Sequence, residues 1–289
     1  MSVHIESAGY RARIDERGAE LKSLAAISTG NEYIWHGDPA WWNGSAPVLF
    51  PVIGGLKDGV YRYQGTTYQL PSHGFARQSD FRVAEKSDER VVFELTANEE
   101  TRAVYPFEFR LLVEFVMDYS GLSVRYRVCN EGAGPMYFSI GSHPAFVLDF
   151  GAGPLERYFL HFSAPESAER YFFRDGLLLP DSEPVLNNHR QLFLTRSLFD
   201  RGPLIFTQFN SDEISIRCSR NPHRVTVMLN DAPCLAVWSK PGGAPFLCIE
   251  PWHGLPDPVE STGDLTIKPG IMTLAAGKDF HTGYSVQID

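Results

Sequence analysis

Long apolar runs, an excess of positive charge and closely paired cysteines are all missing from this sequence of 289 residues. No stretch approaches 18 uninterrupted apolar residues, which argues against a membrane-spanning helix. The 26 Lys and Arg residues are outnumbered by 35 Asp and Glu, for a net charge of −9. We therefore expect no nucleic-acid partner and no anionic membrane partner, because both require a basic surface. Met1–Glu6 shows no basic segment followed by an apolar run, so we expect no secretory signal and a cytoplasmic protein.

Cysteine is rare and widely spaced, at Cys129, Cys218, Cys234 and Cys248, with no C-x-x-C pair. In a chain without a secretory signal, such cysteines are expected to be reduced and mostly buried. The same spacing argues against a zinc site built from cysteine and histidine. We therefore predict no metal ligands in this sequence.

Helical periodicity is also scarce, because no segment of 12 or more residues keeps an apolar stripe at helical spacing. Residues 38–42 and 101–105 could each form about one turn. A period of two dominates instead, and residues 109–117 and 122–128 predict a hairpin joined by a turn at 118–121. Further strand candidates are 61–70, 91–96, 214–218, 225–229, 247–250 and 284–288.

Many short strands separated by turns predict an antiparallel sandwich or barrel rather than alternating strands and helices. The 25 Gly and 20 Pro residues agree with this pattern, since many short strands need many turns. No low-complexity linker or internal repeat divides the sequence. We therefore predict an all-β fold in which residues 1–289 form a single large domain.

Three short segments differ from ordinary strand or turn sequence. They are 72–77 (SHGFAR), 141–146 (GSHPAF) and 248–254 (CIEPWHG). Pro144 favours an extended backbone at His143, and Pro251 predicts that the strand holding Glu250 ends there. Taken alone, a histidine beside Gly or Pro is usually a loop residue bonded to a carbonyl, and a tryptophan usually packs in the core.

Together, two histidines and one glutamate suit the opening of a cyclic hemiacetal. This reaction needs a base for the proton of the anomeric hydroxyl and an acid for the ring oxygen. Aromatic side chains can cover the C–H face of a sugar ring, while His, Arg, Asn and Asp bind its hydroxyls.

The ordered motifs resemble those of the aldose 1-epimerase (galactose mutarotase-like) family, and more narrowly its aldose epimerase-related branch. The motifs are PVLFPVIG at 47–54, HGFAR at 73–77, His143-Pro144, and IEPW at 249–252. The similarity runs from Gly18 to Tyr284. It implies a large antiparallel β-supersandwich with a sugar in a cleft across one sheet, and neither a metal nor an organic cofactor.

The resemblance also implies the roles of individual residues. Glu250 matches the general base, His143 matches the general acid, and His73 matches a second histidine that binds the sugar near its ring oxygen. Arg77 is expected to contact a hydroxyl or a phosphate. Trp252 and Phe75 are expected to form walls of the cleft.

Two positions depart from the family pattern. Lys57 stands where related sequences place a sugar-binding arginine, so it either substitutes for that residue or the contact is absent. The family's sugar-binding aspartate has three candidates here, Asp200, Asp212 and Asp231, and the sequence does not choose among them.

The leading functional hypothesis is an isomerase that interconverts the anomers of a free hexose such as glucose or galactose. A second keeps the fold and the chemistry but takes a hexose 6-phosphate, with Lys57, Arg77 and Lys240 as candidate phosphate ligands. A third is a carbohydrate-binding module that has lost catalysis. The sequence leaves the oligomeric state open.

Overall fold

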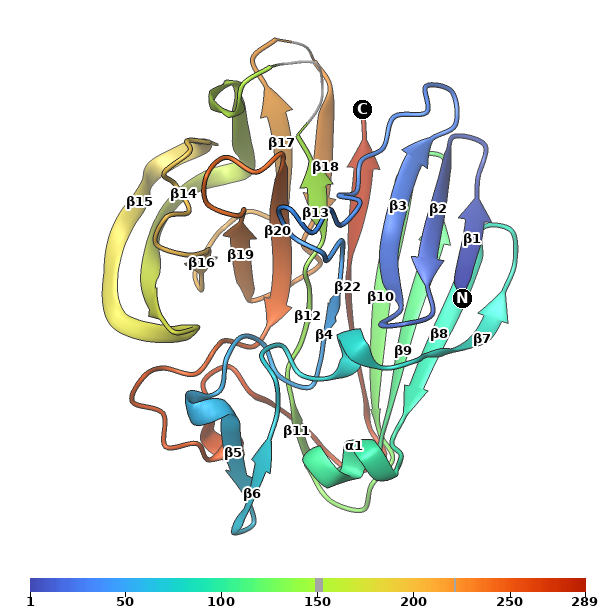
Figure 1. Cartoon of the computed structure of the whole chain (residues 1–289), viewed down its shortest axis with the longest axis vertical. Helices are drawn as coiled ribbons and strands as arrows, with labels where there is room; N and C mark the ends of the chain where they lie inside the picture. Colours follow the sequence, from blue (N-terminus) through green and yellow to red (C-terminus); the bar gives the residue numbers. More distant parts are fainter. Residues whose placement is uncertain (149–152, 221) are drawn as a thin grey trace.

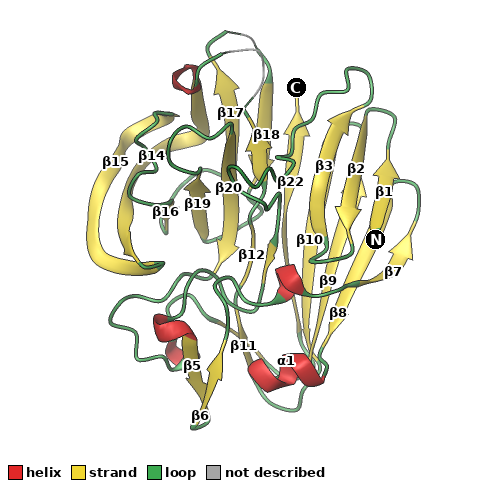
Figure 2. Cartoon of the chain, in the orientation of Figure 1, coloured by secondary structure: helices red, strands yellow, loops and turns green. Residues whose placement is uncertain are grey.

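Antiparallel β-sheets make up most of the computed structural model, which describes residues 1–148, 153–220 and 222–289 (Figures 1 and 2). The predicted all-β class is confirmed. The largest sheet has nine strands, in the order β15 (Leu177–Phe193), β14 (Tyr158–Arg174), β17 (Glu213–Cys218), β18 (Arg224–Met228), β22 (Asp279–Ile288), β10 (Gly121–Asn130), β9 (Phe109–Met117), β8 (Arg90–Thr96) and β7 (Arg82–Lys86).

A six-stranded sheet packs against the large one. Its members are β16 (Leu204–Phe206), β19 (Cys234–Trp238), β20 (Phe246–His253), β12 (Ile140–Ser142) and β4 (Val48–Leu49), with β13 (Ala145–Val147) also paired to β20. Smaller sheets are β1 (Ser2–Glu6), β2 (Tyr10–Asp15) and β3 (Glu20–Ala26); β5 (Val60–Tyr63) and β6 (Thr66–Gln69); and β11 (Met136–Phe138) and β21 (Met272–Leu274).

The predicted hairpin at 109–128 is present as β9 and β10, with Val113 opposite Tyr126. Alternate residues of β9 are buried, as the period of two predicts. The candidates at 91–96, 214–218, 225–229, 247–250 and 284–288 appear within β8, β17, β18, β20 and β22.

Two strand predictions are wrong in detail. Residues 61–70 form the hairpin β5–β6 rather than one strand, because Gln64 and Gly65 both adopt positive φ in a tight turn. Pro251 does not end its strand, since β20 continues to His253. One neighbour of β20 changes from β13 to β12 at this point, so the missing N–H of Pro251 falls where the ladder is already interrupted.

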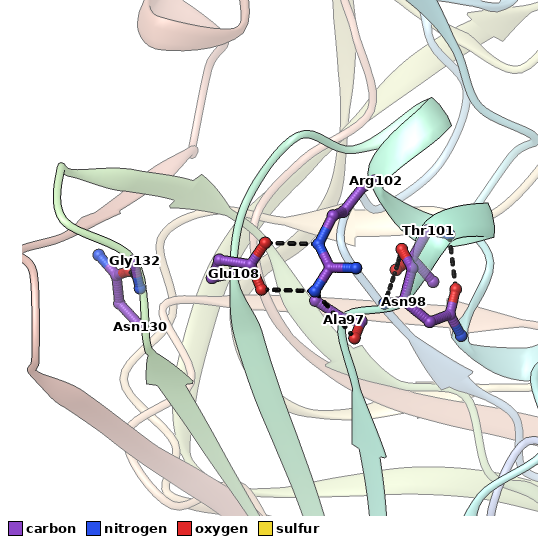
Figure 3. Close-up of polar contacts among 7 residues, drawn as sticks. All are labelled: Ala97, Asn98, Thr101, Arg102, Glu108, Asn130 and Gly132. Atoms are coloured by element: carbon purple, nitrogen blue, oxygen red, sulfur yellow. Dashed lines mark hydrogen bonds and ion pairs between the residues drawn. The ribbon is translucent and has the colours of Figure 1, made fainter.

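Helices are few and short. The turn predicted at 101–105 is part of α1 (Glu99–Val104), whose first turn is held by reciprocal hydrogen bonds between Asn98 and Thr101 (Figure 3). The guanidinium of Arg102 binds Glu108, with Nη2 2.8 Å from Oε2. Residues 38–42 form a turn instead of a helix. The 3₁₀ helices are η1 (Lys57–Gly59), η2 (Ala76–Gln78), η3 (Leu155–Arg157) and η4 (Leu265–Ile267).

The two faces of β20 have different surroundings. Leu247 and Ile249 point into the main apolar cluster, which also includes inner residues of the nine-stranded sheet. Cys248 and Trp252 alternate with them and belong to two separate clusters on the opposite face. Glu250 lies between those clusters on this outer face. The curved hairpin β14–β15 adds Phe173 and Leu178 to the cluster around Trp252, so it borders the same face (Figure 1).

All four cysteines are free and buried, which confirms the prediction from their spacing. Among the described residues, no helix combines the length and the apolar character that a membrane crossing requires.

Candidate active site

The interruption between β12 and β13 brings His143 beside Glu250. The main chain of His143 is held by its N–H, which donates to the Pro47 carbonyl at 3.2 Å. The Pro144 carbonyl accepts the Ile249 N–H of β20 at 3.3 Å. As a result, Nε2 of His143 lies 3.3 Å from Oε2 of Glu250, and both side chains are buried.

Burial shifts the protonation of this pair toward neutral forms. It raises the pKa of Glu250 well above its usual value, and the nearby Trp252 indole N–H partly offsets this effect. Burial also lowers the pKa of His143 well below its usual value, and electrostatic interactions with the neighbouring His73 and Arg77 add to the shift. Both shifts favour the neutral forms, a carboxylic acid next to an imidazole.

His73 lies on the other side of His143, with 5.7 Å between the ring centroids. Burial and the neighbouring Arg77 lower its pKa to about 4. The Gly54 N–H donates to Nδ1 of His73 at 3.2 Å, so the neutral ring carries its proton on Nε2 and can donate there. The backbone turns sharply at this point: His73 has a φ of 66°, and a Cβ at Gly74 would collide with the Phe50 carbonyl.

Three buried polar atoms in this region have no hydrogen-bond partner among the residues that the structure describes. They are Oε2 of Glu250, Nδ1 of His143 and Nε1 of Trp252. Buried polar atoms without partners are uncommon in folded proteins, and a ligand that supplies donors and acceptors would satisfy those of Glu250 and Trp252. Both residues lie on the outer face of β20, which makes this face a candidate binding site for a polar molecule.

Aromatic rings enclose the pair. Trp42 stacks on His143 with 4.8 Å between centroids and 27° between planes, and Trp238 meets the same imidazole edge-on at 5.8 Å. Trp42 belongs to none of the sequence motifs, and its only sequence signal is the doubled tryptophan at 41–42. Gly141 leaves room for the Trp252 ring, since a Cβ there would overlap it.

The remaining predicted site residues differ in how close they lie to the two histidines and in what they contact. Trp252 lies close to His73, with 6.3 Å between ring centroids. Arg77 is exposed and acts electrostatically on both histidines. Phe75 packs on Phe50 and on two further core rings, so its main contacts are structural. Lys57 directs its ammonium group to the Ser261 carbonyl at 3.3 Å.

The aspartate candidates are dispersed. Asp200, Asp212 and Asp231 all lie on exposed loops, and Asp212 accepts the Ser163 hydroxyl at 2.7 Å. A different carboxylate, Asp257, is buried behind the site and pairs with the buried ammonium of Lys268 at 2.8 Å.

Asp257 also ties together the backbone around the site. Its Oδ2 accepts the Lys57 N–H at 3.0 Å, and its own N–H donates to the Gly55 carbonyl at 2.9 Å. Gly55 follows Gly54, whose N–H holds the ring of His73. The buried pair therefore supports the loop on which His73 rests.

Cys248 completes a group of possible metal ligands with His143 and Glu250, whose donor atoms lie within 4.8 Å of one another. Metal binding requires the thiolate and the carboxylate forms. Burial raises the pKa of both acids well above their usual values, so both groups carry protons in this environment. The arrangement is better suited to proton transfer than to holding a metal ion.

Comparison with known proteins gives a consistent result. The sequence model of the family described as "Aldose 1-epimerase" matches residues 1–266. Protein LacX (chromosomal) of Lactococcus lactis subsp. lactis is 31% identical over 281 residues, which covers 94% of each chain.

Two solved structures are similar over nearly their whole length. A galactose mutarotase related enzyme from Lactobacillus acidophilus has a TM-score of 0.96 at 34% identity, covering 100% of this chain and 97% of the other. A galactose mutarotase-like protein from Lactobacillus casei has a TM-score of 0.94 at 35% identity, covering 100% of both chains.

Proposed function

The chain belongs to the aldose 1-epimerase family of isomerases, and on this premise we propose that it interconverts the α and β anomers of a free hexose such as glucose or galactose. One observation carries the proposal: a buried acid and a buried imidazole, Glu250 and His143, lie 3.3 Å apart beside unpartnered polar atoms.

The reaction needs two coordinated proton transfers. Glu250, as the carboxylate, removes the proton of the C1 hydroxyl while His143, as the imidazolium, protonates the ring oxygen. The ring then opens to the aldehyde. Rotation about the C1–C2 bond presents the other face of the carbonyl, and reclosure with the transfers reversed yields the other anomer.

The proton content of the pair matches this cycle. Neutral Glu250 with neutral His143 holds the same number of protons as carboxylate with imidazolium, so a single transfer between them prepares the reactive form. Sugar hydroxyls that donate to Glu250 stabilise the carboxylate, because hydrogen bonds to the charged form lower its pKa. Binding of the substrate therefore favours the form that performs the chemistry.

Neighbouring residues supply binding contacts in this proposal. His73 donates from Nε2 to the sugar near its ring oxygen, as its tautomer allows. Trp252 lies beside the sugar and offers its indole N–H, which is close to Glu250, to a hydroxyl. Arg77 binds a hydroxyl from the solvent side. We assign Lys57 and Phe75 weaker contributions, since the ammonium of Lys57 is already hydrogen-bonded and Phe75 packs in the core.

A free hexose is preferred to a hexose 6-phosphate as the substrate. Among the three candidate phosphate ligands, Lys57 is occupied by a carbonyl and Lys240 is an exposed loop residue, which leaves Arg77. A single exposed cation on a chain of net charge −9 gives weak support for a dianionic ligand.

Polarimetry tests the proposal directly. Freshly dissolved α-glucose or α-galactose should reach its equilibrium rotation faster with the protein than in buffer alone. Glu250→Gln should return the rate close to that of buffer while the protein remains folded. A wild-type rate equal to the buffer rate for several free hexoses would refute the choice of substrate. The 6-phosphates would then be examined by NMR exchange measurements.

A further inference from the structure

In the described part of the chain, no other residue orients the ring of His143 through a hydrogen bond at Nδ1; the ring interacts there only with the main chain of His143 itself. The ring of a catalytic histidine is normally fixed by a carboxylate or carbonyl that accepts from the nitrogen facing away from the substrate. Nδ1 of His143 is buried and makes no hydrogen bond to another residue in the described part of the chain. Main-chain contacts hold the backbone of His143, but they do not fix the rotation of its ring.

Stacking supplies the missing restraint. The indole of Trp42 covers one face of the imidazole at 4.8 Å, and Trp238 contacts the ring edge-on at 5.8 Å. An imidazole held between a parallel ring and a perpendicular ring has little freedom to turn about its side-chain bonds.

Trp42 is itself firmly held. Its N–H donates to the Asp38 carbonyl at 2.8 Å, and its own carbonyl accepts the indole N–H of Trp35 at 2.8 Å. Its ring also packs on Phe246, with 5.8 Å between centroids. A side chain at Gly44 would collide with the indole, so the loop is shaped around it.

The far end of this loop is also anchored. Oε1 of Glu20 accepts the N–H groups of Ser45 and Ala46, at 2.6 and 3.1 Å. Both ends of the segment that holds Trp42 are therefore tied to other parts of the fold, so the position of the indole over His143 is a built feature of the structure.

We propose that Trp42 is a positioning residue for His143: its stacked indole, in place of a hydrogen bond from another residue to Nδ1, fixes the plane in which Nε2 reaches the substrate and Glu250. The inference rests on the proposed function of His143 as the general acid. It assigns Trp42 a role in the chemical step rather than in substrate affinity.

The indole also controls the contact of His143 with water. The titratable and charged groups that face His143 are Glu250 and Cys248 on β20, and His73 and Arg77 on the neighbouring loop and η2. None of these groups changes when Trp42 is replaced. Loss of the indole exposes the imidazole to solvent, so the pKa of His143 should move up toward its ordinary value.

The test compares Trp42→Phe, Trp42→Leu and Trp42→Ala with the wild type. Phenylalanine keeps a flat face, whereas leucine keeps bulk without one. Trp41→Phe is the matched control, because Trp41 is the adjacent, similarly buried tryptophan of the same loop. We expect Trp42→Leu and Trp42→Ala to lower kcat about 10- to 100-fold with little change in KM. This is the usual effect of removing a residue that orients a functional side chain. Phe should retain most of the activity, and the control should match the wild type.

An NMR titration of the histidine ring protons, with His143 assigned through His143→Gln, provides a second readout that needs no substrate. The His143 signal should titrate at higher pH in Trp42→Ala than in the wild type or in Trp41→Phe. A rise in KM at constant kcat would overturn the proposal and make Trp42 a sugar-binding surface. A His143 titration unchanged in Trp42→Ala would also overturn it, even if no hexose proved to be a substrate.

Discussion

Nε2 of His143 lies 3.3 Å from Oε2 of Glu250, although the two residues belong to distant parts of the sequence. One comes from the interruption between β12 and β13, and the other from the middle of β20. Both side chains are buried, and burial favours the neutral form of each. This relationship leads to predictions about activity and about stability.

Glu250→Gln should separate activity from stability. Turnover should fall at least about 100-fold because the base is lost. The free energy of unfolding at pH 7 should rise by about 0.5–2 kcal/mol, as is common when a strained active-site group is removed. The sign of this change follows from the raised pKa of Glu250 in the folded protein. Above pH 4.5, the ordinary pKa of a glutamate, the carboxyl ionises in the unfolded chain but stays protonated in the folded one, and this difference favours unfolding. Glutamine does not ionise, so the variant loses this destabilising contribution.

Polarimetry and thermal unfolding measure the two effects of Glu250→Gln. Glu260→Gln, on an exposed loop, is the control and should change neither. A glutamine variant that is less stable than the wild type at pH 7 would contradict the assignment of a neutral, buried acid.

Stability should decrease as the pH falls from about 6.5 to about 4. His73 and His253 are both kept neutral by burial, which lowers each pKa to about 4. In this window the unfolded chain binds protons that the folded chain does not, so each histidine contributes a slope of up to about 1.4 kcal/mol per pH unit.

Urea unfolding between pH 4 and pH 7.5 measures this slope. His73→Asn combined with His253→Asn should flatten the profile, because asparagine does not titrate. An identical slope in the double variant would show that other groups control the acid response.

The buried pair of Asp257 and Lys268 should be needed for stability as a unit. Lys268→Met should lower the free energy of unfolding by about 3–5 kcal/mol, because it leaves a carboxylate buried without its partner. The double variant Asp257→Leu, Lys268→Met should recover part of this loss in chemical denaturation. A double variant no more stable than Lys268→Met would show that the backbone contacts of Asp257 outweigh the charge pairing.

Arg77 and Lys57 should differ in their effect on substrate binding. Arg77→Met should raise KM about 10- to 100-fold, the cost of losing a hydrogen bond from a charged donor. Lys57→Met should change KM less than about threefold, since the ammonium of Lys57 is bonded to Ser261 rather than free for a sugar. Steady-state polarimetry measures KM for the two variants. A larger rise in KM for Lys57→Met than for Arg77→Met would show that Lys57 makes the sugar contact for which related sequences use an arginine.

Local sequence signals predicted much of the fold. The alternation in 109–117 and 122–128 corresponds directly to β9 and β10, because period two reflects one buried face. Proline was misleading at position 251. The effect of its missing N–H depends on the neighbouring strand, and that neighbour changes from β13 to β12 only in the assembled sheet.

The candidate site was partly accessible from the sequence. Motifs identified His73, His143 and Glu250, and their roles in catalysis stay predictions, as do the single-domain organisation and the absence of nucleic-acid and membrane partners. Trp42, Asp257 and Lys268 carry no motif. Their importance arises from contacts with residues distant in the chain, which short-range patterns do not encode.

Patterns along the sequence predicted the shortage of long helices, the all-β class, the free cysteines and the residues able to carry acid–base chemistry. These properties depend on composition and on periodicity along the chain. The folded structure adds what these patterns do not contain: Glu250 lies beside His143 in a buried setting, with an indole stacked on the imidazole. Protonation and ring orientation depend on burial and on packing partners, which exist only when distant segments meet in the folded chain.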